Sequence, residues 1–210
     1  MIRRAMIPAL LLSLLAGCSS LPDKPVREVM YDFGPLATTA GPAPAEGAAP
    51  LVLNSVNAAA SLETPAMLYR LGYADANQLR PYAYARWSAP PAELLEQRLR
   101  EHLGRSRPVL SSAAGAALAR RSGALPPLLR VELEEFSHQF DTPGASRGVL
   151  RVRCTLLEST IGGDRLVAQR SFAVERAAPT PDAAGGVRAL AAASEAVAQE
   201  IANWLAQQQR

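Results

Sequence analysis

Few side chains in this sequence have the types and spacing that catalysis or metal binding requires. The chain holds two histidines, His102 and His138, with no His-Glu-x-x-His motif and no paired Cys-x-x-Cys. Its single lysine, Lys24, lies near the N-terminus, which excludes a Ser-x-x-Lys nucleophile and a P-loop. The sequence therefore predicts a protein that is not an enzyme, with no catalytic residues, no cofactor and no metal.

The cysteine at position 18 has the clearest chemistry. Two arginines at positions 3 and 4 precede an apolar run over residues 5–15, and Leu15-Ala16-Gly17 leads into Cys18. The run is about half the roughly 20 apolar residues that a membrane-spanning helix needs, so it is typical of a signal peptide. Its end resembles the lipobox of bacterial lipoproteins. This resemblance implies cleavage before Cys18, a diacylglycerol thioether on its sulfur, and acylation of the new amino terminus, for example by palmitate.

Three segments follow from this interpretation. Residues 1–17 are expected to be the signal peptide, residues 18–28 the lipidated cysteine and a tether, and residues 29–210 a single domain. About nine extended residues reach at most roughly 30 Å, so the domain would stay close to its membrane. Ser19, where an aspartate would retain the protein in the inner membrane, resembles the sorting signal for the periplasmic face of the outer membrane.

Charge and cysteine content exclude further classes of function. The chain has 22 basic and 19 acidic residues, and removing Arg3 and Arg4 with the signal leaves a mature chain close to neutral. No basic patch indicates nucleic acid as a partner. With Cys18 lipidated, Cys154 has no partner for a disulfide, and its position between Val152 and Leu156 predicts a small core residue.

Hydrophobic periodicity predicts an α+β fold. Strands are expected near residues 29–33, 51–56, 66–73, 82–87, 108–110, 128–138, 148–159 and 165–176, and helices over residues 90–104, 113–121 and 183–208. Residues 34–50 are rich in proline and alanine and predict a flexible loop. The expected fold is a mostly antiparallel sheet with two main helices packed on one face, in the order strands, helix, strands, helix.

The final helix carries an apolar stripe at helical spacing, formed by Val187, Leu190, Ser194, Val197, Ile201 and Trp204. Such a stripe covers either the back of a sheet or a second helix in a coiled coil. The sheet is the favoured interpretation.

An acidic cluster and an aromatic segment remain as candidate sites. Glu132 and Glu134 share a strand face and are a conceivable carboxylate pair for hydrolysis, although a solvated sheet face is favoured. Between residues 68 and 87, tyrosines and arginines alternate, and both types are common at the centres of protein interfaces. The candidate partner contacts are Tyr69, Arg70, Tyr82, Tyr84 and Arg86, whereas Trp87 is expected in the core.

The same segment carries a resemblance to a known family. Tyr69-Arg70, Tyr82, Arg86-Trp87, Pro90-Pro91 and the leucines at 95, 99 and 103, four residues apart, resemble the ABC-type transport auxiliary lipoproteins, the paraquat-inducible protein C-like lipoproteins of MCE systems, over roughly residues 18–206. The resemblance implies a docking component, anchored in the outer membrane, of a system that moves phospholipids between the two membranes. Its partners would be an MCE-domain protein of an ABC transporter and, in a homo-oligomer, further copies of itself.

Two alternatives stay open at this point. One is an assembly or activator lipoprotein that serves lipopolysaccharide export or cell-wall synthesis. The other is a lipid-anchored hydrolase that uses Glu132 and Glu134.

Overall fold

The structure is a computed structural model, and it describes residues 27–35, 47–160 and 162–208. The strands in these residues are β1 (Val29–Tyr31), β2 (Leu51–Leu53), β3 (Asn57–Ala58), β4 (Ala66–Leu71), β5 (Leu79–Trp87), β6 (Val109–Leu110), β7 (Leu128–Thr142), β8 (Ala145–Thr160) and β9 (Gly163–Ala177). The helices are α2 (Pro91–Gly104), α3 (Ser112–Ser122) and α4 (Ala183–Gln207), with a 3-10 turn at η1 (Ala60–Leu62). The signal peptide, Cys18 and most of the expected loop at residues 34–50 lie outside the described residues.

Helix α2 forms as its sequence predicts. Pro91 opens the first turn, where a missing N–H costs nothing. Leu95, Leu99 and Leu103 are fully buried on one face. A partly buried face carries an ion pair between Glu96 and Arg100, one helical turn apart, with 2.9 Å between nitrogen and oxygen, and Arg100 also donates to the carbonyl oxygen of Leu53.

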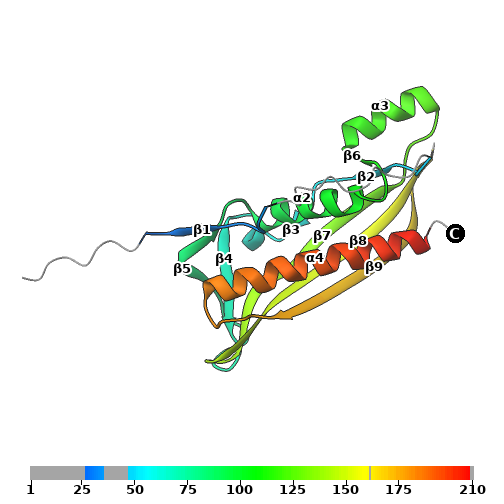
Figure 1. Ribbon diagram of the computed structural model, residues 1–210. Helices are drawn as coiled ribbons and strands as arrows, with labels where there is room; N and C mark the ends of the chain where they lie inside the picture. Colours follow the sequence, from blue (N-terminus) through cyan, green and yellow to red (C-terminus); the bar gives the residue numbers. More distant parts are fainter. Residues whose placement is uncertain (1–26, 36–46, 161, 209–210) are drawn as a thin grey trace, which may run out of the picture.

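Helix α4 packs across the long strands β7, β8 and β9 and against α2 (Figure 1). All members of its apolar stripe are buried, so the stripe covers the sheet as expected. Asp182 caps the helix by accepting a hydrogen bond from the Gly185 N–H at 2.7 Å. Figure 1 shows α2 and α4 side by side on one face of the sheet, with α3 projecting from the far end.

Strands β7, β8 and β9 form the predicted antiparallel meander. On β8, the side chains of Leu150, Val152, Cys154 and Leu156 alternate toward α4 and are buried. Cys154 is therefore the core residue that its position predicts, and burial raises the pKa of its thiol to about 12.

The α+β class is confirmed, but the expectation of a mostly antiparallel sheet is wrong. The nine strands within the described residues form one mixed sheet, in which five strand pairings are parallel and three antiparallel. The reason is the crossover through α2, which brings β7 back parallel to strands that precede the helix. The long β7 pairs in turn with β2 at Val52, β3 at Asn57 and β4 at Tyr69.

Helix α3 sits apart from the other two helices. It contacts β2 and β6 through Gly115, where an added Cβ would lie 2.4 Å from a methyl carbon of Val52. Ser111 caps its start, and Gly123, with φ of 76°, ends it. None of the helices in the described part of the chain is long and apolar enough to cross a membrane.

The close approach of α4 to β8 at Gly148 predicts a strong effect of a single methyl group. An added Cβ at Gly148 would lie 2.8 Å from the backbone nitrogen of Leu190. Gly148→Ala should therefore lower the free energy of unfolding by about 1–3 kcal/mol, since the helix must shift away from the sheet. Urea unfolding followed by tryptophan fluorescence measures this.

Gly144→Ala in the β7–β8 turn is the matched control, because nothing lies within 4 Å of a Cβ added there. Equal stability losses in the two variants would contradict the tight helix–sheet contact.

Candidate docking surface

The segment richest in tyrosine and arginine forms strands β4 and β5, and a bulge in β5 decides where its side chains point. The pairing jumps from Ala66 opposite Arg86 to Leu68 opposite Pro81, so β5 holds extra residues between these points. A bulge redirects the side chains beside it. Tyr84 consequently lies outward with 56% of its surface exposed.

The strand next to Tyr84 carries exposed apolar side chains. Strand β1 pairs with β5, with Val29 opposite Ala85 and Met30 opposite Arg86. Met30 is 62% exposed, and Val29 is also exposed. β1 stands at the end of the strand order, and within residues 27–35, 47–160 and 162–208 no further strand pairs with this edge of the sheet. Met30 and Tyr84, together with the ion pair between Arg86 and Glu28 at 2.6 Å on the same face, make up what we call the β1–β5 edge patch, whereas Val29 points to the opposite face with Ala85.

Tyr82 and Tyr69 are partly buried and lie away from this patch. The Tyr82 hydroxyl and Nδ1 of His138 are 2.8 Å apart, within hydrogen-bond distance, and the Tyr69 and Tyr82 ring centroids are 4.6 Å apart. His138 is fully buried between Tyr82, Phe140 and Gly186, where only a glycine leaves room for the imidazole. The two tyrosines therefore brace the junction of β4, β5, β7 and α4.

Burial sets the protonation of this junction. It raises the pKa of Tyr82 above its usual value, an effect to which the charges of Tyr69 and Asp182 add. Burial lowers the pKa of His138 to about 4, against an opposing pull from the carboxylate of Asp182. His138 is consequently neutral at pH 7.

Arg70 also serves the fold more than the surface. Its guanidinium lies 3.6 Å from the carboxylate of Glu135 on β7 and donates to the carbonyl oxygen of Ala76. Of the five residues singled out from the sequence, Tyr84 and Arg86 belong to the β1–β5 edge patch, whereas Tyr69, Arg70 and Tyr82 hold the adjacent strands together.

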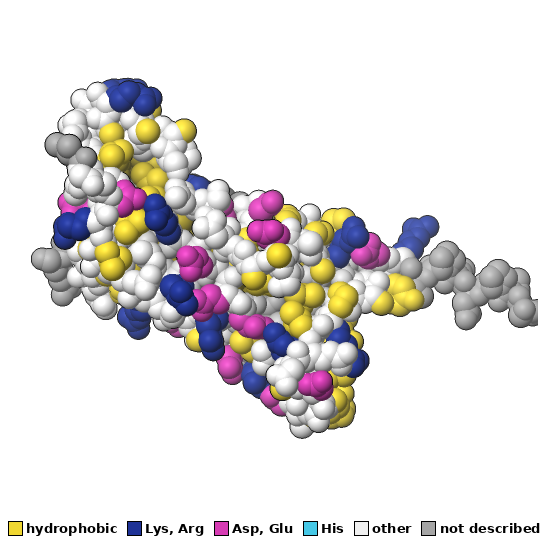
Figure 2. Space-filling model, turned by 180° about the vertical axis from the view of Figure 1, so that it is seen from behind, with side chains coloured by type: hydrophobic (Ala, Val, Ile, Leu, Met, Phe, Trp, Pro, Cys, Tyr) yellow, Lys and Arg dark blue, Asp and Glu magenta, His cyan; other side chains and the backbone are white. Residues whose placement is uncertain are grey.

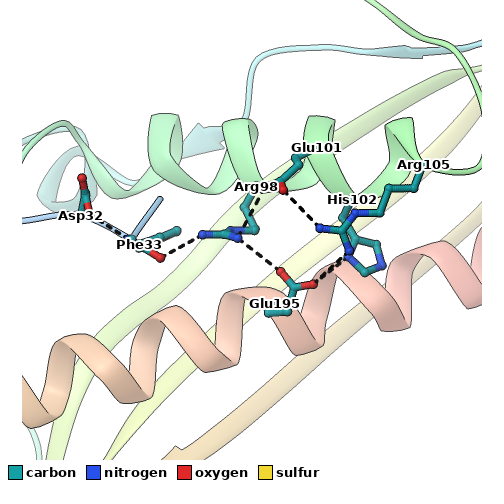
Figure 3. Close-up of polar contacts among 8 residues, drawn as sticks. Asp32, Phe33, Arg98, Glu101, His102, Arg105 and Glu195 are labelled. Carbon is teal, nitrogen blue, oxygen red and sulfur yellow. Dashed lines mark hydrogen bonds and ion pairs between the residues drawn. The ribbon is translucent and has the colours of Figure 1, made fainter. Parts of the chain in front are cut away.

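A polar network between α2 and α4 fixes the chain that follows β1 (Figure 3). Arg98 on α2 donates to the carbonyl oxygen of Phe33 at 2.9 Å and lies 3.5 Å from Glu195 on α4. His102 contacts the same carboxylate at 3.0 Å. The helical periodicity of α2 predicts His102 on its polar side, and this prediction is wrong, because His102 is buried between the helices. The sequence could not reveal this because Glu195 is 93 residues away.

The side chain of Phe33 adds apolar contacts at the same point. Its ring packs edge-on against Trp87, with 5.6 Å between centroids, and lies 5.8 Å from the ring of Phe136. The Ser88 N–H donates to the carbonyl oxygen of Tyr31. Core packing and hydrogen bonds thus fix the C-terminal end of β1. The N-terminal end of β1 leads back toward Cys18, so the β1–β5 edge patch lies beside the point where the expected tether joins the domain.

The acidic cluster is an ion-pair network on the open face of the sheet. Arg153 on β8 lies 2.5 Å from Glu134 and 3.8 Å from Glu132. Seen from behind, the body of the domain mixes acidic and basic side chains (Figure 2). Each carboxylate is thus paired with a cation at a solvated surface, as the favoured interpretation of the sequence expects.

The turn between β7 and β8 contains a sequence pattern that also occurs in serine hydrolases. Residues 144–148 read Gly-Ala-Ser-Arg-Gly and match the Gly-x-Ser-x-Gly pattern of serine hydrolases. That pattern needs a turn from a strand into a helix, whereas here it links β7 to β8 in a hairpin. The Ser146 hydroxyl is buried, and no group in the described ranges forms a hydrogen bond with it. The match therefore supplies no activated serine.

Comparison with known proteins assigns the chain to a family. The model of the ABC-type transport auxiliary lipoprotein component family matches residues 31–202. The protein belongs to this family, as the aromatic and leucine pattern of the sequence indicates. Its members are lipoprotein components of transport systems, which implies association with a membrane.

Solved structures share the fold. A protein of the DUF330 family from Xanthomonas campestris has 21% identity and a TM-score of 0.69, over 86% of this chain and 96% of that one. An uncharacterized protein has 16% identity and a TM-score of 0.62, over 85% and 99% of the two chains. No curated protein matches the sequence.

The burial of neutral His138 predicts how stability depends on pH. The unfolded chain binds a proton at His138 below its ordinary pKa of about 6.5, whereas the folded chain does so only below about 4. The free energy of unfolding should therefore fall by roughly 3 kcal/mol as pH decreases through this window. Urea unfolding at pH 7, 5.5 and 4.5 measures the loss.

His138→Gln is the matched variant, because its amide oxygen can still accept from the Tyr82 hydroxyl but does not titrate. It should lose much less stability across the same window. Parallel pH profiles for the two proteins would show that His138 is not the group responsible.

Proposed function

We propose that this protein is the outer-membrane lipoprotein of an ABC-type MCE system that moves phospholipids between the inner and outer membranes. It acts there as a docking component on the periplasmic face and not as an enzyme. Membership of the transport auxiliary family supports the class of function. The sequence around Cys18, which lies outside the described residues, supports the lipid anchor.

The exposure of Tyr84 is the observation that carries the docking role. A tyrosine placed outward by a bulge, beside exposed Met30 and a nearby arginine, offers the residue types that dominate binding energy at interfaces. Such a patch on an edge strand of a sheet is costly to leave in water and prone to unwanted pairing. The MCE-domain protein is the partner that we propose covers it.

The fixed path of the chain after β1 gives this patch a defined orientation. Arg98 and the ring of Phe33 hold the C-terminal end of β1, so the patch keeps a constant position relative to the tether's origin. With a tether of about nine residues, the domain stays within roughly 30 Å of its membrane. The anchor then presents the same edge of the sheet to a partner that spans the periplasm.

The anchor predicts a clear effect of one substitution. Cys18→Ser should abolish incorporation of labelled palmitate and remove the protein from the outer-membrane fraction, because serine cannot form the thioether. Metabolic labelling and density-gradient separation of the membranes measure both. Cys154→Ala is the matched control and should keep the label. Labelling that survives in Cys18→Ser would contradict the proposed anchor.

The docking patch predicts a second effect. Tyr84→Ala should reduce the amount of MCE-domain protein that copurifies with this lipoprotein about tenfold, since loss of a central tyrosine costs on the order of 1–2 kcal/mol of binding free energy. Quantitative pull-down from membranes solubilised in mild detergent measures this.

Tyr73→Ala is the matched control, because Tyr73 is similarly exposed but lies beyond the end of β4. Equal recovery with Tyr84→Ala and the unmodified protein would exclude the patch as the docking site. Recovery of proteins of lipopolysaccharide export or cell-wall synthesis in place of the MCE-domain protein would overturn the proposed system.

A further inference from the structure

The end of the domain opposite β1 contains a cavity of about 300 Å³. Its floor is formed by Leu51, Leu156 and Leu205, which are buried in the core. Leu125 and Val167 stand at its rim and are 45% and 40% exposed. The cavity therefore connects an apolar interior with solvent.

A buried cation lines the same cavity. Arg107 follows α2 and is only 8% exposed. Its Nε is buried, and among the described residues no oxygen accepts a hydrogen bond from this nitrogen. Glu158 also lines the cavity, but it forms an ion pair with Arg165 on β9.

An arginine in this position lacks a counter-charge. A buried charge is costly unless a partner compensates it. Burial also lowers the pKa of the Arg107 guanidinium, the direction expected when no anion stabilises its charge. The cavity thus offers apolar walls together with an uncompensated cation, a combination that suits a ligand with one apolar and one anionic part.

A second hollow extends the cavity beneath α3. It has a volume of about 820 Å³, shares Leu125 and Glu158 with the first, and is lined on the helix side by Ala116 and Ala119. Hydrophobic side chains gather between α3 and the body of the domain in Figure 2. The combined groove is elongated, which suits an extended chain more than a compact ligand.

We propose that this groove binds a single-chain amphiphile with an anionic head, in which a carboxylate or phosphate pairs with Arg107 and the acyl chain covers Leu51, Leu156 and Leu205. The cavity that Arg107 lines is at the lower end of the size range of ligand sites, so it has room for one chain rather than two beside the guanidinium. An apolar protein surface would leave the guanidinium unpaired, so a protein partner fits this site less well. The site is independent of the docking role proposed above.

Photolabelling of the full chain in phosphatidylcholine nanodiscs tests this proposal. Diazirine-bearing stearate and diazirine-bearing lysophosphatidylglycerol are the anionic probes, and diazirine-bearing octadecanol is the neutral one. Mass spectrometry should place the anionic label on peptides that contain Leu125 or Val167, at least tenfold above the neutral label. The stronger of the two anionic labels identifies a carboxylate or a phosphate head.

Arg107→Met keeps the length of the side chain and removes its charge. It should reduce anionic labelling at least tenfold without lowering the thermal unfolding temperature, because the charge it removes is uncompensated. Arg151→Met, at an exposed arginine on β8, is the matched control and should label normally. Val167→Trp blocks the mouth with Arg107 in place, and it should also lose labelling.

Three results would overturn the proposal. Equal labelling by octadecanol would exclude a role for the charged head. Undiminished stearate labelling in Arg107→Met would exclude Arg107 as its partner. Protection by inorganic phosphate as effective as protection by unlabelled stearate would identify a site for a free anion, in which the acyl chain has no part.

Discussion

The packing of α4 across the long meander is the interaction on which the rest of this structure depends. One face of β7, β8 and β9 is apolar and must be covered, and the buried stripe of α4 covers it. Gly148 on β8 allows the helix backbone to approach the sheet closely, and Gly186 on α4 leaves room for the neutral imidazole of His138 on β7. The same helix supplies Glu195, which joins α2 through Arg98, and Arg98 holds the chain just after β1.

The two ends of the domain consequently differ in character. At one end, the network of Arg98, Glu195 and Phe33 fixes β1 and leaves the β1–β5 edge patch open beside the origin of the tether. At the other, α3 stands away from the sheet over a groove that contains Arg107. The open face of the sheet between them is a solvated mixture of charges. The proposals above assign a protein partner to one end and a small amphiphile to the other.

The sequence predicts the elements better than their arrangement. Hydrophobic periodicity places α2, α4 and the three long strands within a few residues of their positions, because each buries one regular face. Parallel pairing is missed because it depends on where β7 lands after a crossover, which no local pattern encodes. The exposure of Tyr84 and the partial burial of Tyr82 follow from a bulge, and the burial of His102 follows from its contact with a distant glutamate. Composition alone therefore could not distinguish the exposed residues from the buried ones.

The central claim is that the β1–β5 edge patch contacts an MCE-domain protein in the intact envelope. A photoreactive amino acid placed at position 84, and for comparison at position 73, tests it in living cells. Contact between the β1–β5 edge patch and the MCE-domain protein predicts a crosslink to that protein from position 84 and none from position 73. No crosslink from position 84, equal crosslinks from both positions, or a crosslink from position 84 only to a second copy of this chain would contradict it.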